Sequence, residues 1–243
     1  MKIGLWNIDH PEHNPRARRQ HGRFLEVAAY LQEQECDLLI LTEANAALPL
    51  AGYHSHFSAA SPYFKKGRCY NPPNQYHQVG MYSKRELATE PVAEPVNGLL
   101  GRMTWQNEAL FVYGNVITIK DQWRQESRKT YTDRLQEQLA QFKQLLGRRL
   151  VVCGDFNLRR NWPQKRGAYK QVEAFAAAHA LIWPTAERTD TVQHVLHSAD
   201  LQTNVTIDFS VKDKNGRGYP LSDHPLMQIE ISDLPSSSPV ADN

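Results

Sequence analysis

Apolar residues occur in short continuous runs along most of the chain, and this pattern predicts a sheet-rich fold. The run Leu38–Leu41 holds four consecutive apolar residues between polar ones, as a strand buried on both faces does. Between Tyr53 and Ile119, short β-rich runs alternate with Gly, Pro and Asn, which is typical of a meander of strands. We expect strands at 2–8, 37–42, 76–83, 103–106, 110–119, 150–153, 205–211 and 226–231.

Three segments have the spacing of an amphipathic helix instead. In the segment 16–34, apolar residues stand at Phe24 and again three, four and seven positions later. The segment 131–146 has similar spacing and is followed by Gly147, a suitable C-cap, and a shorter helix is expected at 169–180. Helices are too few for a doubly wound sheet, so two β-sheets packed face to face with helices outside fit the pattern.

Length and composition indicate one folded domain. A chain of 243 residues with 41% hydrophobic residues is long enough to bury a core without disulfides or a structural metal. No linker or internal repeat divides the chain. We therefore expect a single domain over 1–232 and a disordered Pro- and Ser-rich tail over 233–243.

Charge and cysteine content limit the compartment and the partners. The net charge of +2 permits a nucleic-acid partner without demanding one. Cys36, Cys69 and Cys153 are odd in number and form no C-x-x-C pair, which argues against a disulfide framework and against a zinc site. The chain shows neither a secretory signal nor an apolar stretch long enough to cross a membrane. We expect a cytoplasmic protein with no membrane partner and no obligate protein partner.

Carboxylates and carboxamides stand at the ends of the predicted buried strands. Asn7 and Asp9 lie two residues apart after the first strand, so their side chains point to the same side of an extended chain. Asp155 and Asn157 repeat this spacing in the sequence G-D-F-N, and Glu43 follows the second apolar run. Any one of these residues has an ordinary explanation as a turn residue or helix cap. Their joint occurrence points to a shared site.

Two further acids stand near the C-terminus and extend this set. Asp208 lies inside a predicted strand, and Asp223 and His224 belong to the sequence S-D-H-P before the last strand. Converging carboxylates repel one another unless each is paired, hydrogen-bonded or bound to a cation. Oxygen ligands suit Mg²⁺ or Mn²⁺, and Mg²⁺ commonly takes a substrate phosphate as a further ligand. The pattern therefore predicts a divalent-metal site that acts on a phosphoester.

These segments together resemble the endonuclease/exonuclease/phosphatase superfamily, which includes DNase I and exonuclease III-like relatives. The resemblance spans nearly the whole chain and is carried by W-N-I-D at 6–9, L-T-E at 41–43, G-D-F-N at 154–157, I-D-F at 207–209 and S-D-H-P at 222–225. It implies an α/β (α+β) fold, a four-layered sandwich of two mixed β-sheets flanked by helices.

The resemblance also implies roles for individual residues. The metal ligands, direct or through water, would be Asn7, Asp9, Glu43 and Asp223. Asp155 would orient or deprotonate the attacking water, and Asn157 would donate a hydrogen bond to the phosphate. His224 would bind or protonate a phosphoryl oxygen, with Asp208 hydrogen-bonded to its other ring nitrogen.

Substrate contacts are expected from one strand and one loop. Asn115 stands where many relatives place a phosphate-contacting His or Tyr, and an amide there carries no positive charge. The loop after Asn157 holds Arg159, Arg160 and Trp162, and such a loop favours a nucleic acid because its cations neutralise phosphates while the indole stacks on a base or sugar. Further basic clusters lie at 16–23 and 65–68, although either fits a solvated surface.

The expected function is divalent-metal-dependent phosphodiester hydrolysis by in-line attack of water, as an endonuclease or exonuclease acting on DNA. One alternative is a phosphatase or phosphodiesterase of a small or lipid phosphoester. An alternative of another class is a catalytically weak relative that binds nucleic acid or protein.

Overall fold

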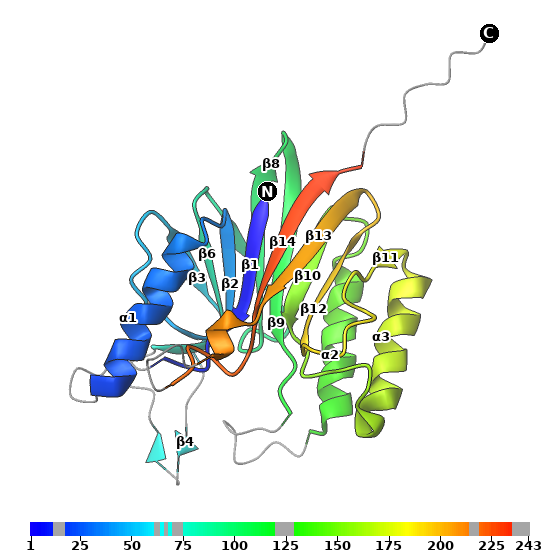
Figure 1. Cartoon of the computed structure of the whole chain (residues 1–243). Helices are drawn as coiled ribbons and strands as arrows, with labels where there is room; N and C mark the ends of the chain where they lie inside the picture. The colour runs from blue at the N-terminus through cyan, green and yellow to red at the C-terminus, as the bar shows by residue number, and fades with distance from the viewer. Residues whose placement is uncertain are drawn as a thin grey trace.

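The computed structural model describes residues 1–11, 18–60, 64–65, 68–69, 75–119, 129–213 and 219–234. Two mixed six-stranded β-sheets make up most of it (Figure 1). In spatial order, the first sheet consists of β13 (Leu201–Asp208), β14 (Leu226–Asp233), β1 (Lys2–Asn7), β2 (Leu38–Asn45), β6 (Tyr76–Ser83) and β3 (His54–Phe57). The second consists of β11 (Leu181–Ile182), β12 (Gln193–Ser198), β10 (Leu150–Asp155), β9 (Glu108–Val116), β8 (Gly98–Trp105) and β7 (Ala88–Glu90).

Three helices, two 3-10 turns and a small ribbon complete the described chain. The helices are α1 (Arg18–Glu33), α2 (Tyr131–Gln144) and α3 (Arg166–Ala178), with 3-10 turns η1 (Pro163–Lys165) and η2 (Ser210–Lys212). A separate two-stranded ribbon pairs β4 (Phe64–Lys65) with β5 (Arg68–Cys69). No helix of the described residues is both long and apolar enough to span a membrane.

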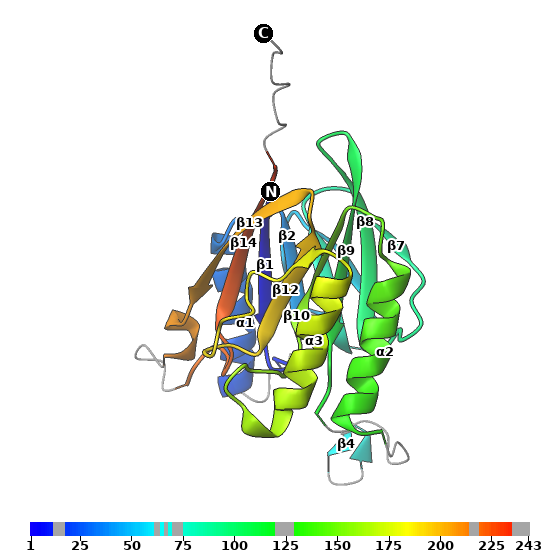
Figure 2. The same cartoon turned by 90° about the vertical axis from the view of Figure 1, so that its right-hand side faces the viewer.

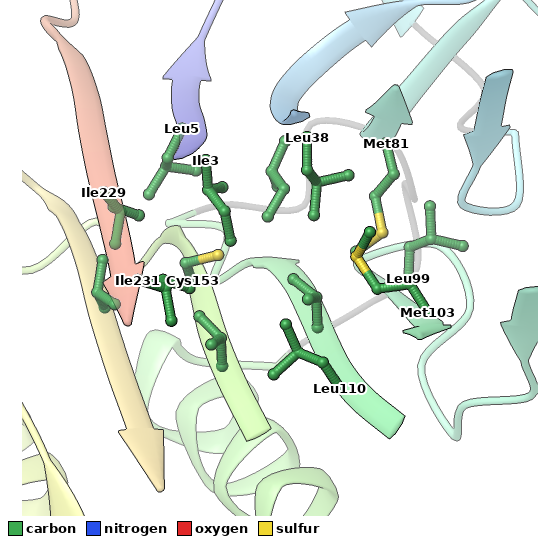
Figure 3. Close-up of a cluster of buried hydrophobic side chains, with 14 of the residues drawn as sticks. Ile3, Leu5, Leu38, Met81, Leu99, Met103, Leu110, Cys153, Ile229 and Ile231 are labelled. Carbon is green, nitrogen blue, oxygen red and sulfur yellow. The ribbon is translucent and has the colours of Figure 1, made fainter. Parts of the chain in front are cut away.

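The two sheets pack face to face on a hydrophobic core. Alternate side chains of β1 point to opposite faces of its sheet. Ile3 and Leu5 enter the core between the sheets, where they join Cys153 of β10 (Figure 3). Trp6 points to the other face and packs with Phe24 of α1. A strand buried on both faces must be apolar throughout, which explains the continuous apolar runs.

Helices cover the outer faces of the sandwich. α1 lies on one side of the molecule, and α2 and α3 lie on the opposite side (Figures 1 and 2). Phe142 of α2 and Val172 of α3 are fully buried in one cluster with Val152 of β10. The expected sandwich of two mixed sheets flanked by helices is therefore confirmed, and the layers hold β1 and β10 rigidly between two cores.

Several element boundaries differ from the sequence-based expectation. β12, β3, β7 and β11 were not anticipated, and β13 ends at Asp208 instead of extending to residue 211. The C-cap of α2 is Leu145, while Gly147 adopts a positive φ of 79° in the following turn. Asp233, placed in the expected disordered tail, belongs to β14, and residues 235–243 of that tail lie outside the described residues.

Candidate active site

The ends of β1 and β10, which belong to different sheets, meet at one edge of the sandwich. The Nδ2 of Asn7 donates to Asp155 Oδ2 at 2.8 Å and to Glu43 Oε1 at 3.2 Å. Asn7 and Asp155 are almost completely buried, and Glu43 is partly buried. Because β1 and β2 are parallel, the carboxyl ends of these two strands lie at the same edge. One amide group therefore brings together two carboxylates that are far apart in the chain.

Similar local turns follow both strands. The Oδ1 of Asn7 accepts a hydrogen bond from Asp9 N at 2.9 Å, and Asp155 Oδ1 accepts one from Asn157 N at 2.8 Å. Both Asp9 and Asn157 have positive φ angles, 50° and 49°, as does Glu43 at 53°. Asp and Asn tolerate this conformation because their side chains bond to nearby backbone groups. Positive φ angles thus occur at all three of these site positions, as they do at many functional sites.

The S-D-H-P segment docks directly on the end of β1. Ser222 Oγ donates to Asn7 O at 2.6 Å and accepts a bond from His224 N at 3.1 Å. Trp6 Nε1 donates to His224 O at 2.9 Å. These bonds hold the backbone of His224 in place while its ring stays partly exposed, with Nε2 3.5 Å from a carboxylate oxygen of Asp223. The imidazole is therefore accessible to a substrate.

Arg23 of α1 joins the first motif to the last. Its Nη2 donates to Ile8 O at 2.6 Å, and its Nε donates to Leu221 O at 2.7 Å. The same guanidinium lies 3.4 Å from the exposed carboxylate of Asp9. The sequence places Arg23 in a basic cluster with a possible role in phosphate binding, but these bonds give it a structural role that also brings positive charge to Asp9.

Glu43 is a carboxylate with little access to water and with other acids nearby. Burial is the main reason that the pKa of this carboxyl is raised to about 7. The negative charges of Asp155, Asp9 and Asp223 raise the pKa further, whereas the hydrogen bond from Asn7 lowers it. A carboxylate in such surroundings gains from a nearby cation. Asn7 Nδ2 and His10 Nε2 also lie near this carboxylate, at 3.2 and 3.6 Å, and the neighbouring carboxylate oxygens are the donor type that suits a hard divalent cation such as Mg²⁺ or Mn²⁺.

Asn7 differs in one respect from its expected role as a metal ligand. Its amide nitrogen, not its oxygen, faces Glu43 and Asp155, so in this structure Asn7 positions the carboxylates. Within the described ranges, no three His, Cys, Asp or Glu side chains form a ready-made ligand set. A Mg²⁺ ion bound here would need water and substrate oxygens to complete its coordination, since Mg²⁺ usually keeps several waters.

Gln193 is a site residue that the sequence analysis did not find. It lies opposite Asp155 in the pairing of β10 with β12, and its side chain is fully buried. The side-chain amide of Gln193 is oriented so that both of its polar atoms are hydrogen-bonded. Its oxygen accepts from Asn7 N at 3.0 Å, and its nitrogen donates to Pro225 O at 2.7 Å. Gln193 therefore fastens the end of β1 to the S-D-H-P segment. Its position follows from strand pairing across the chain, so no local sequence signal marks it.

The expected hydrogen bond between Asp208 and His224 is not formed. Instead, one carboxylate oxygen of Asp208 accepts from the Tyr30 hydroxyl and the other accepts from Ser210 N at 2.7 Å. The reason is the alternation along β13. Ile207 packs against the core between the sheets, so the next side chain points to the opposite face, toward α1.

Asn115, the expected phosphate contact, lies in the interior of the second sheet. Asn115 is fully buried in β9, paired with Gly154 and Gly98, and its amide atoms have no hydrogen-bond partner among the described residues. The site lies two residues further along the chain. There, Ile117 O accepts from Asn157 Nδ2 at 3.2 Å, and Ile117 N donates to Asp155 O at 2.8 Å.

The cations of the loop after Asn157 have different kinds of partner among the described residues. Arg160 forms an ion pair with Glu187, so its charge is compensated. The guanidinium of Arg159 instead lies 5.2 Å from the centre of the Trp162 ring. Lys165, which was not among the expected site residues, lies near the same ring and donates to Asn157 O.

The profile of the Endonuclease/Exonuclease/phosphatase family matches residues 4–224, nearly the whole chain. The chain belongs to the endonuclease/exonuclease/phosphatase family. Proteins of the family are hydrolases that act on phosphoester bonds and generally use divalent metals. No curated protein shows a significant match to the sequence of this family member.

Several solved structures share the fold of this chain. A family protein from Leptotrichia buccalis has a TM-score of 0.63 at 12% identity, over 96% of this chain and 99% of that one. TDP2 of D. rerio, complexed with single-strand DNA product, has a TM-score of 0.57 at 14% identity, over 96% and 98%. Sphingomyelinase C from Streptomyces griseocarneus has a TM-score of 0.56 at 14% identity, over 94% and 98%. At such identities the likeness shows the fold, which therefore carries different substrates within the family.

Proposed function

We propose that this family member is a divalent-metal-dependent phosphodiester hydrolase, and specifically a nuclease that acts on DNA. The observation that carries the proposal is the Asn7 amide, which holds the carboxylates of Asp155 and Glu43 together while Asn7 O receives the S-D-H-P segment. This arrangement joins carboxylates, a carboxamide and an imidazole at one edge of the sandwich. These groups together serve the in-line hydrolysis of a phosphodiester.

In this proposal, Glu43, Asp9 and Asp223 hold Mg²⁺ or Mn²⁺, directly or through water, and Asn7 orients the carboxylates around it. The raised pKa of Glu43, caused first by burial and then by the charges of neighbouring acids, supports the assignment, because a nearby cation would favour the ionised carboxylate. When bound, the cation would stabilise negative charge on the phosphoryl oxygens.

The remaining groups act on water and phosphate. Each carboxylate oxygen of Asp155 accepts one hydrogen bond and keeps a second lone pair, so Asp155 can orient an attacking water and take its proton. Asn157 uses one amide hydrogen on Ile117 O and offers the other to a phosphoryl oxygen. His224, partly exposed beside Asp223, binds or protonates a phosphoryl oxygen.

The substrate assignment rests on the loop after Asn157. Arg159 and Trp162 contact each other there, and this combination of cation and ring suits a nucleic acid. We also propose a cytoplasmic location, which the buried free thiols of Cys36 and Cys153 support because thiols stay reduced there.

The proposal is tested by incubating the protein with supercoiled plasmid, single-stranded and abasic oligonucleotides, RNA and bis-p-nitrophenyl phosphate. Each substrate is assayed with Mg²⁺, Mn²⁺ or EDTA. We expect metal-dependent cleavage of DNA that His224→Ala reduces about 10²- to 10⁴-fold, the range for loss of an acid–base group. His54→Ala, at an exposed position on the edge strand β3, is the matched control.

Three results would contradict the nuclease assignment. Turnover of the small diester alone would indicate a hydrolase of a small or lipid phosphoester. Salt-sensitive DNA binding without cleavage would indicate a catalytically weak binding protein. Equal loss of activity in His224→Ala and His54→Ala would show that the imidazole of His224 has no special role.

A further inference from the structure

Two cations of the loop after Asn157 share one indole ring. The guanidinium of Arg159 lies 5.2 Å from the centre of the Trp162 ring, and Lys165 Nζ lies 5.1 Å from it. Lys165 Nζ also lies 4.0 Å from the centre of the Tyr131 ring. Aromatic faces attract cations, so the Trp162 ring orders both charged groups without neutralising them.

Neither cation has a carboxylate within ion-pair distance among the residues that the structure describes. Lys165 donates one hydrogen bond, to Asn157 O, and its ammonium group has three donors. The Nε of Arg159 is buried without a hydrogen-bond partner. A nearby guanidinium behaves differently, since Arg188 Nη2 lies 2.7 Å from Asp190 Oδ2. Unused donors of cationic groups therefore gather at Arg159 and Lys165.

This pair adjoins the candidate active site. Asn157, whose carbonyl accepts from Lys165, donates its own N–H to Asp155. Tyr131, which packs under the ammonium group, donates its hydroxyl to Phe156 O at 2.7 Å. Burial lowers the pKa of Lys165 to about 8, and the charge of Asp155 opposes this effect, so the two groups interact electrostatically. An anion bound at Lys165 would lie next to the groups proposed to act on the scissile phosphate.

We propose that Arg159 and Lys165 form a second anion subsite, which binds the phosphate next to the scissile one in the substrate chain. The inference rests on the proposed function and narrows its substrate class to a strand with successive phosphates, in contrast to an isolated diester. Because aromatic contacts already order both side chains, little side-chain entropy is lost when the phosphate binds.

The subsite is tested with two substrates that differ in the second phosphate. Fluorescein-labelled oligothymidylate has neighbouring phosphates, and bis-p-nitrophenyl phosphate has none. For Arg159→Met and Lys165→Met, we expect kcat/KM on the oligothymidylate to fall about 10- to 100-fold, as loss of a hydrogen bond to a charged group implies. Turnover of the small diester should fall by a clearly smaller factor than that of the oligothymidylate, since the bond to a neighbouring phosphate is absent there. Lys165→Arg should recover most of the loss, and Arg188→Met is the matched control.

Salt dependence gives a second readout. Each lost phosphate contact should reduce the slope of log kcat/KM against log salt by about 1 for the oligothymidylate. Equal losses on both substrates would overturn the proposal, because they would show that Lys165 only holds the Asn157 turn. Unchanged oligothymidylate kinetics would overturn it as well.

Failure of the proposed function can be recognised separately. If the wild-type protein hydrolyses neither substrate with any metal, the subsite is judged by fluorescence anisotropy of the same oligothymidylate in EDTA. Weaker binding by Arg159→Met and Lys165→Met than by Arg188→Met would support the subsite. Equal binding by all variants, or no binding by the wild type, would overturn it.

Discussion

Asn7 and Asp155 are separated by 148 positions in the chain, yet the amide of one donates to the carboxylate of the other at 2.8 Å. Asn7→Ala removes this donor and also the bond to Glu43. We expect kcat/KM for DNA to fall about 10- to 100-fold, as is usual when a residue that orients metal ligands is lost. Asn204→Ala, at an exposed position of β13, is the control, and equal activity of the two variants would contradict a positioning role for Asn7.

Metal binding should stabilise the fold through Glu43. A metal that binds only the folded protein adds about 2.7 kcal/mol to the free energy of unfolding at 100 times its Kd. We expect Mg²⁺ or Mn²⁺ to raise the Tm of the wild type, EDTA to reverse the rise, and Glu43→Gln to lose most of it. Thermal unfolding with and without metal measures the effect. The same rise in Glu43→Gln would place the ion elsewhere.

Asp208 should affect stability more than activity. Burial opposes its ionisation, but the hydrogen bonds from Tyr30 and Ser210 outweigh burial and lower the pKa of Asp208 below its ordinary value of 3.8. Asp208→Asn should therefore cost about 1 kcal/mol of stability, a typical value for such bonds. Because the pKa is lowered on folding, this cost is fully present above pH 3.8, begins to shrink below it, and is lost as the pH falls through the lower pKa of the folded protein. Urea unfolding at pH 7 and pH 3 measures it. If Asp208→Asn lost as much activity as His224→Ala, the result would instead support the expected hydrogen bond between Asp208 and His224.

Binding of the second phosphate should depend on pH through Lys165. Burial lowers the pKa of Lys165 from 10.5 to about 8, so its ammonium form is present below pH 8 and is lost as the pH rises above it. The ratio of kcat/KM for oligothymidylate to that for bis-p-nitrophenyl phosphate should fall correspondingly. In Lys165→Arg the guanidinium stays charged, and the ratio should stay flat. A parallel fall in both proteins would assign the titration to another group.

Gly154, in the G-D-F-N sequence, should not tolerate a side chain. A Cβ atom there would lie 1.9 Å from the backbone oxygen of Asn115 on the neighbouring strand. We expect Gly154→Ala to destabilise the protein by about 1–3 kcal/mol, as overpacking of a core does. Gly167→Ala is the matched control, since a Cβ at Gly167 in α3 meets nothing within 4 Å. Denaturant unfolding compares the two, and equal stability would contradict the close strand approach.

Several of the strands that sequence reasoning found are buried on both faces. The run Leu38–Leu41 and the segment 76–83 are apolar enough for their pattern to predict β2 and β6. β12 escaped detection because Gln193 and His194 interrupt its apolar character. These polar side chains are nevertheless buried, since partners from distant segments satisfy them, such as Leu158 O for His194. Local pattern contains no information about such partners.

The candidate site shows the same limit. The sequence predicted that Asn7, Glu43 and Asp155 would share a site, because each follows an apolar strand and their joint occurrence is not explained by turns or caps alone. The position of Asp208 could not be predicted in this way, since a shift of one residue along β13 moves a side chain to the opposite face. Lys165 was missed because its position depends on contacts with Tyr131 and Asn157, which only the folded chain shows.

The docking of the S-D-H-P segment on β1 has a consequence for folding. Ser222 Oγ donates to Asn7 O across 215 positions of the chain, and closing so long a loop costs conformational entropy that only tertiary packing can offset. The backbone of His224 is therefore held beside β1 only in molecules whose first sheet is already assembled. A partly folded molecule would have all the residues of the candidate site but not their arrangement.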